Sequence, residues 1–229
     1  MSAMVNPSEQ ELTQARAEEP PLSMAELAYR TIRDRLVMLD IRPGKPINED
    51  QLATSLVIGR TPVREALKRL EHERLVVAYP RRGTFATEVN ITDLTHISEV
   101  RRLLEPVAAA RAAVRATREE RATLTDLATH LETVAAGDAA DTLLRLDLRV
   151  HRALYAATHN PFLEDTLVRY DNLATRIWCL FVDRLPGMAG HVSEHGPLLR
   201  AVVEGDDEQA AKLATEHVVG FEREVRTLL

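Results

Sequence analysis

One carboxylate and three imidazoles lie in helical segments of the C-terminal half of the chain, three of the four on apolar faces. Asp147 and His151 are four residues apart in one such face, and side chains at that spacing project together from a helix. His217 lies in the apolar face of the last helical segment, and His195 stands near the start of the segment before it. These oxygen and nitrogen donors suit a divalent cation, with zinc favoured and manganese and nickel as alternatives. A buried hydrogen-bonded pair of Asp147 and His151 without a metal is the structural alternative.

Residues 60–71, RTPVREALKRLE, form a second stretch whose residue types could do chemistry. Thr61 and Pro62 suit the N-cap and the first position of a helix, and four apolar residues follow at helical spacing on one side. Three cations lie off that side, near the helix start, where the helix dipole opposes them: Arg60, Arg64 and Lys68. Cations at a helix start cost stability, so their presence here indicates a surface kept for binding. DNA phosphates and guanine edges are the expected partners. An ordinary solvated basic face is the alternative.

The elements around that stretch predict a winged helix-turn-helix over residues 23–89. A capped helix begins at Ser23, a short helix covers residues 49–56, and the basic helix follows after a brief turn. After this helix the apolar residues recur at every second position, which predicts strands at residues 75–79 and 84–89. The turn between these strands carries Arg81 and Arg82, so three helices are followed by a hairpin wing with a basic tip.

Helical patterns fill the rest of the chain, so the fold class is mainly α. Residues 90–229 predict an all-α bundle of about six helices with short connections. The expected helices cover residues 92–116, 118–136, 139–158, 162–185, 191–203 and 207–229. Residues 1–22 are polar and acidic, and we expect a disordered tail there.

Charge is distributed unevenly along the chain, whose net charge is −6. Residues 24–89 carry 12 Lys and Arg against 9 Asp and Glu, whereas residues 90–229 carry 16 against 22. A basic segment on an acidic remainder is typical of a DNA-binding head on an effector domain. The single cysteine, Cys179, excludes an internal disulfide. Since no long apolar run or signal-peptide pattern is found, we expect a cytoplasmic protein without membrane contact.

The N-terminal pattern resembles the GntR-type winged-helix transcription regulators. The resemblance covers about residues 24–89 and is carried by Leu52-Ala53, RTPVREAL at residues 60–67, RLE at residues 69–71 and PRRGT at residues 80–84. It implies DNA contacts from Arg60, Thr61, Arg64 and Gly83, with Arg81 and Arg82 as weaker candidates. A position early in the second helix is often Arg in DNA-contacting members but is Asp50 here, so that contact is not carried over.

The C-terminal pattern resembles the FCD ligand-binding domain of FadR-type regulators. The resemblance rests on Asp147 and His151 followed by Leu154 and Asn160, then on Glu194-His195, Gly205-Asp206 and His217. It implies a metal held by Asp147, His151, His195 and His217, whereas His191 fits the spacing less well. It also implies that Arg101, and more weakly Arg176, pairs with a small carboxylate effector that binds beside the metal.

These patterns together predict a ligand-responsive repressor that binds a double-stranded DNA operator as a homodimer and is released by a small organic acid. The alternative is a metal-dependent hydrolase with a DNA-binding appendage, because an open metal position could activate water. A third reading is an architectural DNA binder whose C-terminal domain only dimerises. Of these, the hydrolase lacks a clear general base in the sequence.

Overall fold

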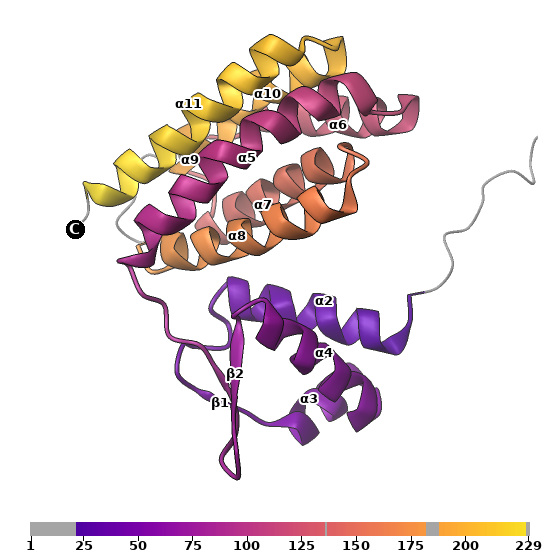
Figure 1. Ribbon diagram of the computed structural model, residues 1–229, viewed down its shortest axis with the longest axis vertical. Coiled ribbons are helices and arrows are strands. Elements are labelled where there is room, and N and C mark those ends of the chain that lie inside the picture. The colour runs from indigo at the N-terminus through magenta and orange to yellow at the C-terminus, as the bar shows by residue number, and fades with distance from the viewer. Residues whose placement is uncertain (1–21, 136, 182–187, 228–229) are drawn as a thin grey trace, which may run out of the picture.

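The computed structural model describes residues 22–135, 137–181 and 188–227 of the chain. It contains an N-terminal domain (residues 22–89) and a C-terminal domain (residues 90–227), each built around its own hydrophobic core (Figure 1). The predicted disordered tail lies, except for Leu22, outside the described residues. None of the helices in the described part of the chain combines the length and the apolarity that a membrane crossing requires.

The N-terminal domain is a winged helix-turn-helix, as predicted. Its helices are α2 (Met24–Val37), α3 (Glu49–Leu56) and α4 (Arg60–His72), and its strands are β1 (Pro46–Ile47), β2 (Val76–Tyr79) and β3 (Gly83–Ala86). The strands form an antiparallel sheet in the order β1-β3-β2, so the wing hairpin gains a third strand that the sequence did not indicate. That third strand, β1, has only two residues, which are too few to show the alternation of apolar and polar residues that predicts a strand.

The basic helix starts two residues earlier than the sequence pattern suggested, at Arg60 rather than at Pro62. Its N-cap is Gly59, which offers no side-chain bond, so Thr61 and Pro62 lie within the first turn rather than at the cap and first position. The preceding turn explains the difference, because Val57 ends α3 in the left-handed region and the chain can enter α4 at once. The predicted apolar side is nevertheless correct, because all four members are buried: Val63, Ala66, Leu67 and Leu70.

The C-terminal domain is an all-α bundle. In the described residues its helices are α5 (Asp93–Arg115), α6 (Arg118–Leu131), α7 (Ala140–Ala156), α8 (Pro161–Cys179), α9 (Met188–Ser193), α10 (His195–Glu204) and α11 (Asp207–Arg226). Helix α5 lies alongside α11, α6 packs on α10, and α7 packs on α8 (Figure 1). This arrangement brings α7, α10 and α11 together although they are far apart in the sequence.

Three predicted helices of this bundle had wrong boundaries. One is α6, which ends at Leu131 although the sequence pattern extended it to residue 136. Helix α8 ends at Cys179 rather than at residue 185, and the single helix expected over residues 191–203 is divided into α9 and α10. Pro197 explains the division, because a proline lacks the N–H that a continuous helix needs but is tolerated in a first turn. Ser193 Oγ also donates to the carbonyl of Gly190 at 2.8 Å, close to the end of α9.

The two domains pack against each other through α2, α7 and α8 (Figure 1). Leu148 of α7 belongs to the hydrophobic core of the N-terminal domain rather than to that of its own domain. Beside it, Arg152 donates to Asp34 of α2 with an Nη2–Oδ1 distance of 2.9 Å. The thiol of Cys179 lies 3.5 Å from the carbonyl oxygen of Val37. The helix-turn-helix is therefore fixed to specific positions on the bundle.

Candidate functional site

The C-terminal domain brings the four predicted metal ligands into one buried cluster, hereafter the His–Asp cluster (Asp147, His151, His195 and His217). One ligand atom from each of the four side chains lies within 4.8 Å of the others. The Nε2 atoms of His151 and His195 are 3.2 Å apart, and Asp147 Oδ1 lies 3.7 Å from His195 Nδ1. All four residues are at most 3% exposed. Helices α7, α10 and α11 therefore direct their polar side chains at one point inside an apolar bundle.

Several polar atoms of the His–Asp cluster lack hydrogen-bond partners among the described residues. These are Asp147 Oδ1 and both ring nitrogens of His217. Leaving a buried polar group without a hydrogen-bond partner costs about 1–3 kcal/mol, so we expect these atoms to have a binding partner. Asp147 Oδ1 and His151 Nε2 are 3.9 Å apart, which is too long for the direct hydrogen bond of the metal-free alternative. The donor set and its orphaned atoms fit a divalent cation.

Burial sets the protonation of these groups. Desolvation lowers the pKa values of His151 and His217 well below the usual range and lowers the pKa of His195 to about 4. The three imidazoles are therefore neutral near pH 7, which is the form that ligates metals. Burial, together with the neighbouring Asp171 carboxyl, raises the pKa of Asp147. A cation in the cluster would favour the ionised carboxylate that burial disfavours.

A second set of polar residues adjoins the His–Asp cluster. Arg101 of α5 donates from Nε to Glu105 Oε1 at 2.5 Å, and its Nη2 lies 3.6 Å from Asp171 Oδ1. The same Asp171 oxygen is 3.8 Å from His151 Nε2, and the hydroxyl of Tyr155 lies 3.0 Å from His151 Nδ1. Arg101 thus lies next to the cluster, but two carboxyl groups already face its guanidinium.

The sequence reasoning missed Asp171, which burial holds at a raised pKa of about 7. One signal could have revealed it, because Asp171 interrupts a helical series of buried residues on α8 that includes Leu167, Ala174 and Trp178. A carboxyl group in such a series needs a partner. In the structure that partner is Arg101.

His191, which fitted the expected spacing poorly, lies against the His–Asp cluster. Its ring stacks on His217 with a centroid separation of 4.2 Å. Glu194 Oε2 is 3.6 Å from His191 Nδ1 and 3.5 Å from His217 Nδ1, and this carboxylate is half exposed. The short helix α9, which the sequence pattern merged with α10, places His191 there.

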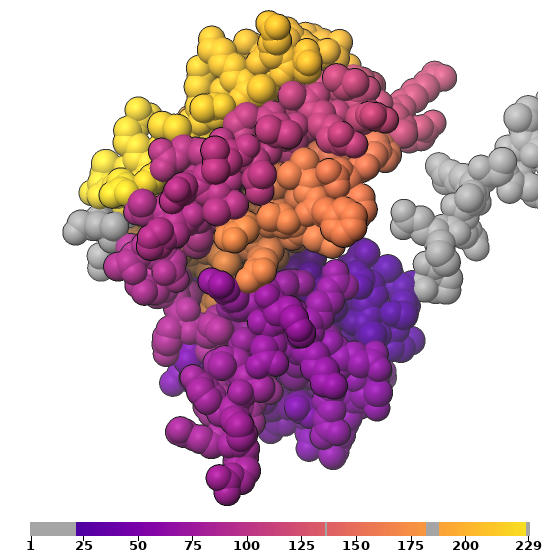
Figure 2. Space-filling view, viewed as in Figure 1, coloured from indigo at the N-terminus to yellow at the C-terminus, as the bar shows by residue number. Residues whose placement is uncertain are grey.

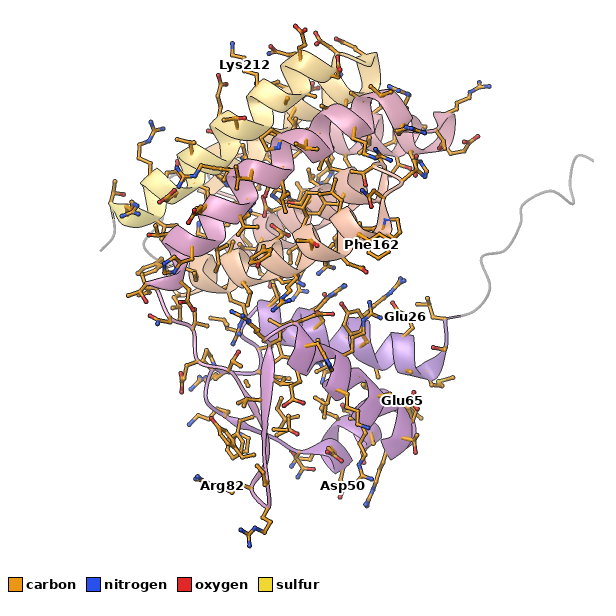
Figure 3. All side chains as sticks on the ribbon, viewed as in Figure 1. Glu26, Asp50, Glu65, Arg82, Phe162 and Lys212 are labelled. Atoms are coloured by element: carbon orange, nitrogen blue, oxygen red, sulfur yellow. The ribbon has the colours of Figure 1, made fainter. Side chains whose placement is uncertain are left out.

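The DNA-binding residues predicted from the sequence lie on an exposed end of the N-terminal domain. Figure 3 places Asp50 and Arg82 at the end of the domain farther from the bundle, with Arg82 at the wing tip, and Figure 2 shows the wing as a separate protrusion. Gly83 follows that tip with a φ of 90°, a conformation that favours glycine, and a Cβ at this position would meet no other atom within 4 Å.

The arginines of α4 carry carboxylate partners from α3. Arg60 Nε lies 2.7 Å from Asp50 Oδ1, and Arg64 Nε donates to Glu49 Oε2 at 2.7 Å. The hydrogen bond that Arg64 donates to the Glu49 carboxylate raises the pKa of Arg64. Both arginine side chains are more than 60% exposed, so their guanidinium groups stay accessible on this face. Thr61 is exposed between them.

Comparison with protein families matches both domains. The FCD domain matches residues 96–220, and the bacterial regulatory proteins of the gntR family match residues 24–86. The chain belongs to the GntR family. It carries the helix-turn-helix of that family and an FCD domain, and it is a DNA-binding transcription regulator.

Individual relatives of this GntR protein are also regulators. It is 30% identical to the Nta operon transcriptional regulator of Aminobacter aminovorans, over 80% of this chain and 85% of that protein. It is 23% identical to the transcriptional repressor RspR of Escherichia coli, over 87% and 88% of the two chains. Among solved structures, E. coli McbR/YncC shares the fold with a TM-score of 0.77 at 21% identity, over 90% of this chain and 99% of that chain. These relatives give the hydrolase alternative no support.

Arg176 of this GntR regulator lies at the junction between the domains. It is 2% exposed and donates from Nη1 and Nη2 to the hydroxyl and the carbonyl of Thr87, at 2.6 and 2.7 Å. Thr87 connects the wing to α5, and Arg176 lines a cavity of about 490 Å³ there. Burial lowers the pKa of Arg176 to about 10. Its hydrogen-bond partners belong to the linker and not to the His–Asp cluster.

Proposed function

We propose that this GntR regulator is a homodimeric repressor whose FCD domain binds a metal ion and a small carboxylate effector, and that effector binding releases the operator. The observation that carries the proposal is that α7 contributes residues both to the His–Asp cluster and to the contact between the domains. Asp147 and His151 of this helix belong to the His–Asp cluster, while the adjacent Leu148 and Arg152 contact the N-terminal domain. One rigid helix therefore touches both the candidate ligand site and the DNA-binding domain.

DNA recognition is proposed for α4 and the wing. Helix α4 would enter the major groove, with Arg60 and Arg64 on guanine edges and Thr61 near the backbone. Arg81 and Arg82 would contact phosphates or the minor groove beside it, and Gly83 would let the wing approach closely. The exposure of the arginines on one end of the domain supports this assignment.

Zinc is the proposed metal, with manganese and nickel as alternatives, and Asp147, His151, His195 and His217 would hold it. Neutral imidazoles and one carboxylate match the ligand preferences of zinc. When bound, the ion supplies positive charge and a coordination position for an anionic ligand. The orphaned buried atoms of Asp147 and His217 are the support for this proposal.

A small organic acid is the proposed effector, with Arg101 as its partner. Arg101 is buried beside the His–Asp cluster and could form a two-pronged hydrogen bond with a carboxylate. Because Glu105 and Asp171 already face the guanidinium, the effector would compete with them. Arg176 is the weaker candidate, since both of its Nη atoms are engaged by Thr87.

Dimerisation is proposed through the outer face of α5. Leu103, Val107 and Val114 lie at helical spacing on this helix and are 68%, 56% and 64% exposed. Apolar side chains gathered on one face suit contact with a second copy of the chain. A dimer would present two α4 helices to successive major grooves of a pseudo-palindromic operator.

The proposal is tested by measuring thermal stability and DNA affinity of the full chain with and without a chelator, across a panel of small carboxylates. An effector at 100 times its dissociation constant should stabilise the protein by about 2.7 kcal/mol and weaken operator binding. The stabilisation should disappear after chelation. If metal removal and every carboxylate leave both stability and DNA affinity unchanged, the C-terminal domain only dimerises and the proposal fails.

A further inference from the structure

Each of the two arginines proposed to read DNA forms an ion pair with a carboxylate of α3. In both pairs the contacting atom of the arginine is Nε, at 2.7 Å from Asp50 for Arg60 and at 2.7 Å from Glu49 for Arg64. The carboxylates are consecutive residues of the first turn of α3, and the arginines are one turn apart on α4. The helix-turn-helix therefore builds two similar pairs side by side on its exposed end.

Contact through Nε leaves a particular edge of each guanidinium available. The guanidinium is a planar fork with five N–H groups, of which Nη1 and Nη2 carry four. Among the described residues, neither Arg60 nor Arg64 forms any other ion pair, so the Nη edge of each faces no carboxylate. Two parallel N–H groups are what the O6 and N7 acceptors of guanine require. A side chain already fixed by a carboxylate also loses less freedom when it binds.

The carboxylates are not needed to cap α3. Asn48 fills that role, because its Oδ1 accepts from the backbone N–H groups of Asp50 and Gln51 at 2.9 and 3.0 Å. The side chains of Glu49 and Asp50 are therefore free to contact α4. Asp50 is also the residue at which this chain departs from the GntR pattern, where an arginine often contacts DNA. In this chain Asp50 pairs with Arg60, so we assign it the role of holding Arg60 in place of a DNA contact of its own.

We infer that Glu49 and Asp50 are specificity-determining positioning residues, which hold Arg64 and Arg60 with the Nη edge turned toward guanine. The inference rests on the proposed DNA-reading role of the two arginines. Their negative charges also repel phosphates, which lowers affinity for every sequence alike. The operator regains this loss through oriented guanine contacts, whereas random DNA does not. The two carboxylates thus increase the ratio of operator to random binding.

The test uses the full chain and a random library of duplex DNA, from which the unaltered protein selects its binding motif. Affinity for the selected duplex and for a scrambled duplex of the same composition is then measured for Glu49→Gln, Asp50→Asn and Arg64→Ala. Glu65→Gln is the matched control. Glu65 is an exposed acidic residue on α4, and we assign it no role in holding Arg60 or Arg64. Circular dichroism verifies that each variant is folded.

We expect Glu49→Gln and Asp50→Asn each to lower the ratio of selected to scrambled affinity by about fivefold or more, as weakened guanine readout implies. Combining Glu49→Gln with Arg64→Ala should lower it no further than Arg64→Ala alone. If the carboxylates only repel DNA, both affinities rise equally and the ratio stays constant, which overturns the inference. If Arg64→Ala keeps the ratio of selected to scrambled affinity, the proposed reading role fails instead, so the two failures are distinguishable. The control Glu65→Gln should keep the original ratio.

Discussion

Arg152 donates a hydrogen bond to Asp34 across the domain junction, and Arg152 is the residue directly after His151. The Nη2–Oδ1 distance is 2.9 Å, and both side chains are partly exposed. Leu148, one turn earlier on α7, is buried in the core of the N-terminal domain. A shift of α7 caused by a change at the His–Asp cluster would therefore move contacts of the DNA-binding domain.

Arg152→Ala should uncouple the effector response from DNA binding. Because ion pairs near the surface contribute about 1 kcal/mol at most, and this pair is partly exposed, the substitution should lower the unfolding free energy by about 1 kcal/mol. Metal content and carboxylate-induced thermal stabilisation should stay unchanged, while carboxylate-induced loss of operator affinity should fall several-fold. Arg149→Ala is the control, since Arg149 is an exposed arginine of the same helix. A full response of the Arg152→Ala protein would exclude this contact as the route.

His217→Ala should lower the metal content of the purified protein. The substitution removes one of the four donors, and the three that remain should bind the metal less tightly. Elemental analysis should give clearly less metal per chain than for the unaltered protein, and a chelator should no longer lower the melting temperature. His130→Ala, at an exposed position on α6, should leave the metal content unchanged. Equal metal content in the two variants would remove His217 from the ligand set.

Arg101→Ala should both destabilise the protein and abolish the carboxylate response. Removing one partner of a buried ion pair costs about 3–5 kcal/mol, because Glu105 and Asp171 would lose their cation. The double variant Arg101→Met with Glu105→Gln removes the charges of the Arg101–Glu105 pair and should recover part of that loss, while Asp171 stays without its cation. Thermal unfolding measures the recovery, and basal operator binding should persist. A normal carboxylate response in the double variant would exclude Arg101 from the effector site.

Leu103→Arg combined with Val107→Arg should convert the proposed dimer into a monomer. Two arginines on the apolar face of α5 would place like charges opposite each other across a symmetric interface. Light scattering after size-exclusion chromatography measures the mass, and operator affinity should fall with the loss of the second α4. Phe162→Arg is the control, because Phe162 is 84% exposed on α8. A monomeric unaltered protein, or a dimeric double variant, would contradict the proposed interface.

Much of the local structure followed from the sequence. The apolar side of α4, the wing turn and the all-α C-terminal domain each depend on neighbours a few residues apart. The predicted cap at Ser23 sets the start of α2 through a side-chain bond to the backbone N–H of Glu26. Boundaries were less predictable where competing signals were short, as in β1, or where Pro197 divides two adjacent helices.

The sequence by itself determined which residue types stand on which helical faces, including Asp147 and His151 on one face of α7. Only the tertiary structure decided which faces meet. Packing of α7, α10 and α11 closes the His–Asp cluster, adds Asp171 and His191 beside it, and assigns Arg176 to the linker at Thr87. It also pairs Asp50 with Arg60 across the helix-turn-helix. The physical reason is that periodicity reports interactions within one helix, whereas these contacts depend on how separate helices pack.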